Sequence, residues 1–168
     1  MRGQAYVFIN FQQAARFGHV GWGVALGDGY NFHFGSTDHL YKDSYLNVLA
    51  LARYMSVPPG GDLDWWAAVG PRDEMLRLMS QGPHIRYHAY KTIEIATPDP
   101  ARAIAAAESL REGGWHVALN NCVHHVHRVL TAYGDRLSLP APDNPLTNLI
   151  PRRWFSSLPG PAHSIISD

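Results

Sequence analysis

Residues 18–35 carry the pattern that most restricts the fold of this chain, because a stretch of alternating large and small residues is followed by a turn signal and a second strand-like stretch. Large apolar residues take every second position over residues 19–26, so one side of a strand would carry Val20, Trp22, Val24 and Leu26. The other side begins with His19 and continues with small residues, which leave room for another backbone or a substrate. Gly27-Asp28-Gly29 is a strong turn signal, and residues 30–35 follow as a second strand. The segment therefore predicts an antiparallel hairpin.

The register of this hairpin depends on the length of its turn. A two-residue turn at Asp28-Gly29 places His33 on the side away from His19 and puts Asp38 opposite His19. A three-residue turn reverses the faces and brings His33 to the side of His19. The sequence leaves both registers open.

The only cysteine of the chain, Cys122, lies at the expected start of a helix. Asn120 or Asn121 is a suitable N-cap, and Gly134 is a fitting stop. The apolar residues between them recur at helical spacing, namely Val123, Val126, Leu130 and Tyr133. Unpaired N–H groups and the positive end of the helix dipole favour a thiolate at this position. A lone cysteine is also commonly a small buried hydrophobe, and that structural role is the alternative.

The rest of the chain predicts a single α+β domain over residues 1–168, with a small antiparallel sheet packed against the cysteine helix. The further expected elements are a strand at 6–11, a helix at 43–55, a turn of helix around Trp65-Trp66, a helix at 71–80, a strand at 84–96, a helix at 100–111, an extended lead at 115–119 and a brief helix at 152–158. The paired tryptophans fit a core edge better than a substrate groove. From about residue 138 the chain is rich in proline, which indicates a long surface loop.

Composition excludes several classes of partner. Fourteen basic residues balance fourteen acidic ones, so there is no basic field for nucleic acid or anionic lipid. The N-terminal residues resemble neither a signal peptide nor a membrane span, so we expect no stable membrane association. A single cysteine forms no internal disulfide, and the expected location is the cytoplasm.

A cysteine at a helix start and a histidine on a strand are typical of papain-like chemistry, and here the histidine comes first. The motifs are His19-Val20-Gly21, Tyr30-Asn31-Phe32-His33-Phe34-Gly35-Ser36 and Asn120-Asn121-Cys122-Val123-His124. In this order the chain resembles the circularly permuted papain-like (NlpC-type) families. It is most similar to the PPPDE group, which includes the deSUMOylating isopeptidases.

The resemblance implies a permuted papain-like fold and a thiol hydrolase that cleaves an amide, peptide or isopeptide bond without a cofactor. Cys122 would be the nucleophile and His19 the general base and acid, acting on a peptide, a protein tail or a small amide. His33 would orient His19, because the related lecithin:retinol acyltransferase-like group carries a second histidine five residues after a Gly-Asp turn. Asp38 in that role, or a bare Cys-His pair, are the alternatives. A lipid acyltransferase using the same pair and an inactive binding module are the other functions that fit.

The histidines near the cysteine also suggest a metal site. His124 and His127 lie three residues apart on one helix face, with His116 and His125 nearby, and three such ligands plus water would make a catalytic zinc centre. This face is polar, however, and no carboxylate or cysteine has ligand spacing with the pair. We therefore predict no bound metal and interpret these residues as surface or core-edge histidines.

Overall fold

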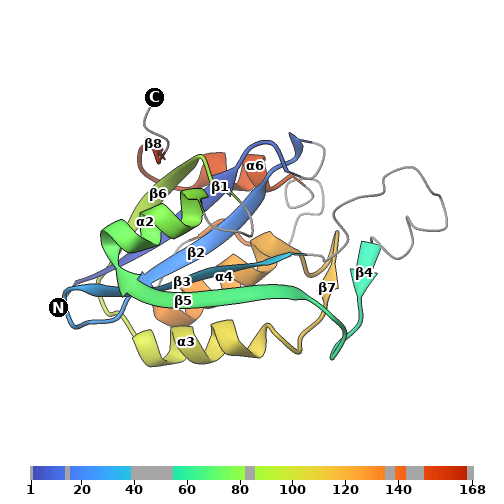
Figure 1. Cartoon of the computed structure of the whole chain (residues 1–168), viewed down its shortest axis with the longest axis horizontal. Coiled ribbons are helices and arrows are strands. Elements are labelled where there is room, and N and C mark those ends of the chain that lie inside the picture. The colour runs from blue at the N-terminus through green and yellow to red at the C-terminus, as the bar shows by residue number, and fades with distance from the viewer. Residues whose placement is uncertain are drawn as a thin grey trace.

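The computed structural model describes residues 2–13, 16–38, 55–81, 86–134, 139–142 and 150–165. A six-stranded antiparallel sheet crosses the domain in the order β5-β3-β2-β1-β6-β8 (Figure 1). Its strands are β1 (Gly3–Asn10), β2 (His19–Ala25), β3 (Asn31–Asp38), β5 (Asp64–Pro71), β6 (Ala89–Ile95) and β8 (His163–Ser164). Two further strands, β4 (Ser56–Val57) and β7 (Trp115–His116), pair separately. The described helices are α2 (Arg72–Gln81), α3 (Pro100–Ser109), α4 (Cys122–Tyr133) and α6 (Pro151–Ser157).

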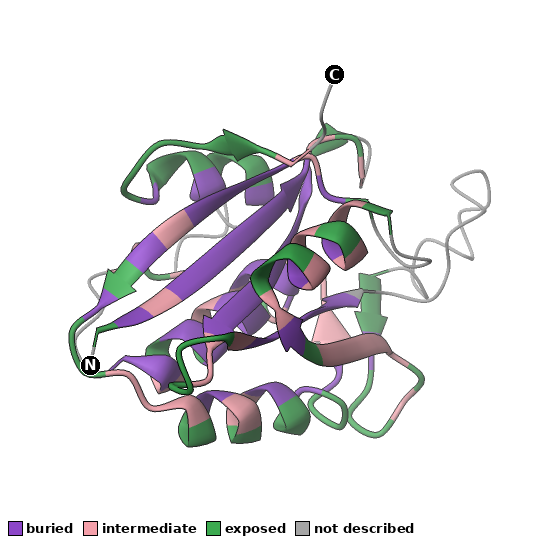
Figure 2. Cartoon of the chain, turned by 60° about the vertical axis from the view of Figure 1, so that its left-hand side comes forward, coloured by how far each residue is buried: buried purple, intermediate pink, exposed green. Residues whose placement is uncertain are grey.

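Helices pack on both faces of this sheet. One apolar cluster joins alternate residues of β1 and β2, including Trp22, to α3, α4 and α6. The opposite cluster joins the intervening residues of β1, including Phe8, and residues of β3, including Phe34, to Met75 and Met79 of α2. Figure 2 shows β1 and β2 buried along most of their length, whereas the outer sides of the helices are exposed. The α+β class and an antiparallel sheet packed against the cysteine helix are therefore confirmed.

The β2–β3 hairpin has the register that sequence analysis assigned to a two-residue turn. Val24 lies opposite His33, and the Leu26 N–H bonds the Asn31 carbonyl at 2.9 Å. The loop between Leu26 and Asn31 nevertheless has four residues rather than two. Asp28 Oδ1 closes this loop by accepting from the backbone N–H groups of Tyr30 and Asn31. An even number of loop residues keeps the same faces paired, which is why both loops give one register.

The turn of helix expected around Trp65-Trp66 is wrong, because both residues lie in β5. Strand residues alternate between faces, so Trp65 packs on the cluster beside α4 and Trp66 on the cluster beside α2. Their indole N–H groups bond the Ala107 carbonyl and the Ser36 hydroxyl at 2.9 and 2.8 Å. Paired aromatic residues favour strands, and this pairing with β3 outweighs the helical interpretation.

Most of the remaining expectations agree with the structure to within a few residues at the element ends. The extended lead expected at 115–119 is wrong beyond β7, because residues 117–119 form a turn, and the strand expected from residue 84 begins at Ala89. The helix after Asp99 is α3, and the Asp99 carboxylate accepts from the Arg102 N–H at 3.0 Å. The helices expected at 71–80 and 152–158 are α2 and α6, and the strand expected at 84–96 is described as β6. Residues 43–54 of one expected helix lie outside the described residues. Among the described residues, no helix is both long enough and apolar enough to span a membrane.

Candidate functional site

Cys122 is the first residue of α4, as its sequence context predicted. Asn121 is the N-cap, and its Oδ1 accepts from the Val123 N–H at 3.0 Å. The Asn121 side-chain amide also donates to the Val117 carbonyl at 2.7 Å, which holds the incoming chain against the cap. Gly134 ends the helix. Cys122 is only 4% exposed and belongs to the apolar cluster that α4 forms on the sheet.

His124 completes the helix cap. Its Nδ1 lies 3.0 Å from Asn121 Oδ1 and 3.3 Å from the Asn121 backbone nitrogen. A protonated Nδ1 donates to the first atom, and a deprotonated Nδ1 accepts from the second, so each tautomer has one of these bonds. The side chain therefore stabilises the start of α4 in both tautomers.

His19 lies at the start of β2 and is buried, and both of its ring nitrogens bond other residues. Nε2 lies 2.9 Å from the Thr37 carbonyl oxygen. Because a carbonyl only accepts, Nε2 carries a hydrogen. Nδ1 lies 3.0 Å from the Tyr87 hydroxyl, which donates to the neutral ring and accepts from the protonated ring. Tyr87 thus holds the ring from the α2 side of the sheet.

Thr37 links His19 to the cysteine helix. Its carbonyl accepts from His19, and its Oγ1 lies 2.5 Å from Nδ1 of His125. His125 lies three residues after Cys122, on the same side of α4. The structure therefore brings His19 and the first turns of α4 to the same end of the sheet. A direct contact between the Cys122 sulfur and His19 stays a prediction.

His125 is fully buried, although sequence analysis treated it as a surface or core-edge residue. Its Nε2 has no hydrogen-bond partner among the described residues. Burial lowers the pKa of His125 from 6.5 to about 3, and the positive charge of Arg128 acts in the same direction. The ring is therefore neutral at physiological pH. Helical spacing could have found this residue, because it shares the buried stripe with Cys122, Val126 and Val129.

His33 lies on the other face of the sheet from His19, so the prediction that it orients His19 is wrong. The observed register pairs it with Val24, and its Nδ1 accepts from the Trp22 indole at 3.4 Å. Burial lowers the pKa of His33, and Glu108 partly opposes this shift. Thr37 is four residues farther along β3, which is about 13 Å in a strand. Asp38, the alternative, ends β3 opposite Asp64, and its side chain lies outside the described part of the chain.

The space that the glycines of β2 leave beside His19 is filled by the protein itself. A Cβ at Gly21 would lie 2.8 Å from the Tyr87 hydroxyl and 2.9 Å from the end of the Met79 side chain. At Gly23 the sulfur of Met75 would lie at 2.8 Å. The small residues therefore admit α2 and Tyr87 to the sheet, rather than a substrate.

No three histidine, cysteine, aspartate or glutamate side chains of the described residues are grouped so that they could hold a metal ion. His124 and His127 instead line a groove on the outer face of α4. Searches against protein-family models, curated proteins and solved structures find no match for this chain.

Proposed function

We propose that this protein is a thiol hydrolase of the permuted papain-like type, which cleaves an amide, peptide or isopeptide bond. Cys122 is the nucleophile, and His19 carries the proton. The observation that carries the proposal is the Thr37 link, which ties His19 to the first turns of the helix that begins at Cys122. A peptide, a protein tail or a small amide is the substrate.

The chemistry follows from the start of α4. The first N–H groups of a helix point out of its N-terminus, where they stabilise a thiolate and the oxyanion that forms when it attacks a carbonyl. The sulfur forms a thioester as the carbon–nitrogen bond breaks, and His19 gives its proton to the leaving amine. Water then hydrolyses the thioester and regenerates Cys122.

The hydrogen-bond partners of His19 can serve both protonation states of its ring. An imidazolium has two N–H donors, and here the Thr37 carbonyl and the Tyr87 hydroxyl can accept one each. In the neutral ring the lone pair is on Nδ1, because Nε2 donates to Thr37. Proton transfer from Cys122 therefore requires Nδ1 to exchange Tyr87 for the sulfur. Such a rearrangement on substrate binding is part of the proposal.

A binding module without catalysis is the second candidate, and two observations favour it. Cys122 is 4% exposed, and both His19 nitrogens already bond protein groups. In that case the cysteine fills the core, and His19 fastens β3 and Tyr87 to β2.

Alkylation of Cys122 separates the two candidates. We expect iodoacetamide to modify it at neutral pH faster than an ordinary thiol, and His19→Ala to slow the reaction about tenfold. The rate is measured from pH 5 to 9, with circular dichroism as the folding control. His33→Ala is the matched control, because it also removes a buried histidine but lies about 13 Å along β3 from Thr37. We expect it to leave the rate unchanged.

The proposal fails if wild type and His19→Ala react alike and as slowly as a free cysteine. Equal slowing by His19→Ala and His33→Ala would also contradict it, because the effect would then come from general loosening of the core.

A further inference from the structure

We propose that the groove between the outer faces of α3 and α4 binds an anionic group, carboxylate or phosphate, of the substrate. This inference rests on the proposed function, because it assigns the groove to the molecule that Cys122 attacks.

The groove has the size and the chemistry of a binding site. Its volume is about 420 Å³, which is within the range of small-molecule pockets. Its polar lining comes from both helices and the turn before α4, and consists of Arg102, Asn120, His124, His127, Arg128 and Thr131. The other lining residues that the structure describes are apolar, and none of the described lining residues is a carboxylate. In a chain with equal numbers of acidic and basic residues, the charged side chains among the described lining residues are therefore all cationic.

Arg128 is the cation that we expect to contact the ligand. Its side chain is exposed, and Nη1 would lie 3.9 Å from a Cβ at Gly113, so the guanidinium reaches back toward the N-terminal end of α4. No ion pair joins it to a carboxylate within the described part of the chain. By contrast, Arg77 bonds Glu74 at 2.7 Å, and Arg111 lies 3.7 Å from Glu108. A guanidinium matches carboxylate or phosphate with two parallel hydrogen bonds.

One end of the groove lies at the start of α4. Asn120 and His124 line it, and they flank the Asn121 cap at the start of α4. Arg128 follows Cys122 by six residues, which is about 9 Å along the helix axis. An anion held at Arg128 therefore belongs to a substrate whose scissile amide lies two or three residue lengths away. This points to short acidic or C-terminal peptides and to phosphorylated amides.

Direct binding of small anions tests the groove. Succinate and inorganic phosphate are titrated separately into the protein of residues 1–168 at constant pH and ionic strength, with chloride as the balancing salt. The ring C–H signals of His124 and His127 are followed by NMR. We expect saturable shifts of both signals with at least one anion, and a dissociation constant at least fivefold weaker in Arg128→Gln. Arg77→Gln is the matched control, since it removes an exposed arginine on the opposite face of the sheet, and we expect it to bind like wild type.

The stronger of the two anions identifies the chemistry, carboxylate or phosphate. Shifts that do not saturate, an Arg128→Gln affinity equal to wild type, or an equal loss in Arg77→Gln would each overturn the inference. The titration involves no bond cleavage. Its failure with normal Cys122 alkylation therefore rejects the groove alone, whereas an inert Cys122 with intact anion binding rejects the proposed hydrolase.

Discussion

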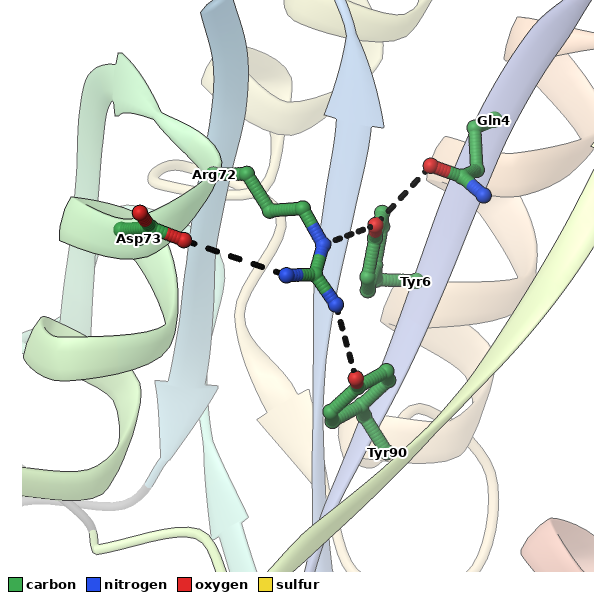
Figure 3. A network of polar contacts seen from close by, with 5 residues as sticks. All are labelled: Gln4, Tyr6, Arg72, Asp73 and Tyr90. Carbon is green, nitrogen blue, oxygen red and sulfur yellow. Dashed lines mark hydrogen bonds and ion pairs between the residues drawn. The ribbon is translucent and has the colours of Figure 1, made fainter. Parts of the chain in front are cut away.

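Two polar networks join helices to this sheet, and they differ in how completely they are satisfied. On the α2 face, Arg72 donates to the hydroxyls of Tyr6 and Tyr90 at 3.0 and 2.9 Å, and Tyr6 donates to Gln4 at 2.9 Å (Figure 3). Asp73 lies 3.8 Å from the same guanidinium. The arginine side chain is 47% exposed, so water can replace any partner that is lost.

The second network, His19–Thr37–His125, lies at the end of the sheet where α4 begins. All three residues are buried, and His125 Nε2 has no partner among the described residues. A buried nitrogen without a hydrogen bond costs about 1–3 kcal/mol. The Arg72 network therefore fastens α2 to the sheet, whereas the Thr37 network keeps an arrangement that stability alone does not favour. Functional sites commonly carry such a cost.

Acid should reveal the largest difference between the networks. Between about pH 6.5 and pH 3 the unfolded chain binds a proton at His125 and the folded protein does not, so the free energy of unfolding falls as the pH falls. The full interval corresponds to on the order of 5 kcal/mol, of which about 2 kcal/mol is lost between pH 7 and pH 5. His33 contributes in the same direction, because burial lowers its pKa as well.

Urea unfolding at pH 7, 6 and 5 measures this fall in the free energy of unfolding. The double variant Thr37→Val/His125→Phe removes both partners and should lose about 2 kcal/mol less than wild type over that range. His163→Phe, which removes an exposed histidine, should lose as much as wild type. If the free energy of unfolding of the double variant falls with pH as steeply as that of wild type, His125 is not buried as a neutral ring.

A smaller effect is expected from Thr37→Val alone. The substitution conserves shape and leaves the backbone carbonyl that holds His19, but it leaves Nδ1 of buried His125 without its partner. We expect a loss of about 1–3 kcal/mol in the free energy of unfolding at pH 7. The double variant should be more stable than this single one, because it removes both halves of the bond. Additive effects of the two substitutions would show that Thr37 and His125 do not interact.

The start of α4 could be predicted from sequence because its signals are local. Asn121, the apolar stripe and Gly134 all act within one helix, and each is where the pattern placed it. The same stripe contains His125, so its burial was readable from spacing. The interpretation of His125 as a surface or core-edge residue gives more weight to the polarity of its side chain than to its place in the helical stripe, and this is why it does not identify the burial.

The partners of His19 depend on contacts far apart in the sequence. Tyr87 comes from the segment before β6, and Thr37 from the end of β3. The local sequence pattern does not determine which residues contact the His19 ring. These contacts depend on the order of the strands in the sheet and on which side chains fill the space beside Gly21. The face of His33 likewise depends on whether the loop has an even or odd number of residues. Asp28 settles this through side-chain bonds that the turn motif alone does not specify.

The smallest expected effect comes from the satisfied network. Tyr6→Phe removes one hydroxyl while the ring keeps its packing between Phe8 and Tyr90. Arg72 and Gln4 lose a partner, but the exposed side of the arginine lets water take its place. We therefore expect the free energy of unfolding, measured in urea at pH 7, to fall by about 0.5–1.5 kcal/mol, and its dependence on pH between pH 7 and pH 5 to stay as in wild type.

Burial raises the pKa of Tyr6, so the wild-type network should instead weaken above pH 10, where the unfolded chain ionises first. Tyr30→Phe, at an exposed tyrosine of the β2–β3 loop, is the matched control and should change neither quantity. A loss in Tyr6→Phe larger than that in Thr37→Val would reverse the comparison and make the Arg72 network the more demanding of the two.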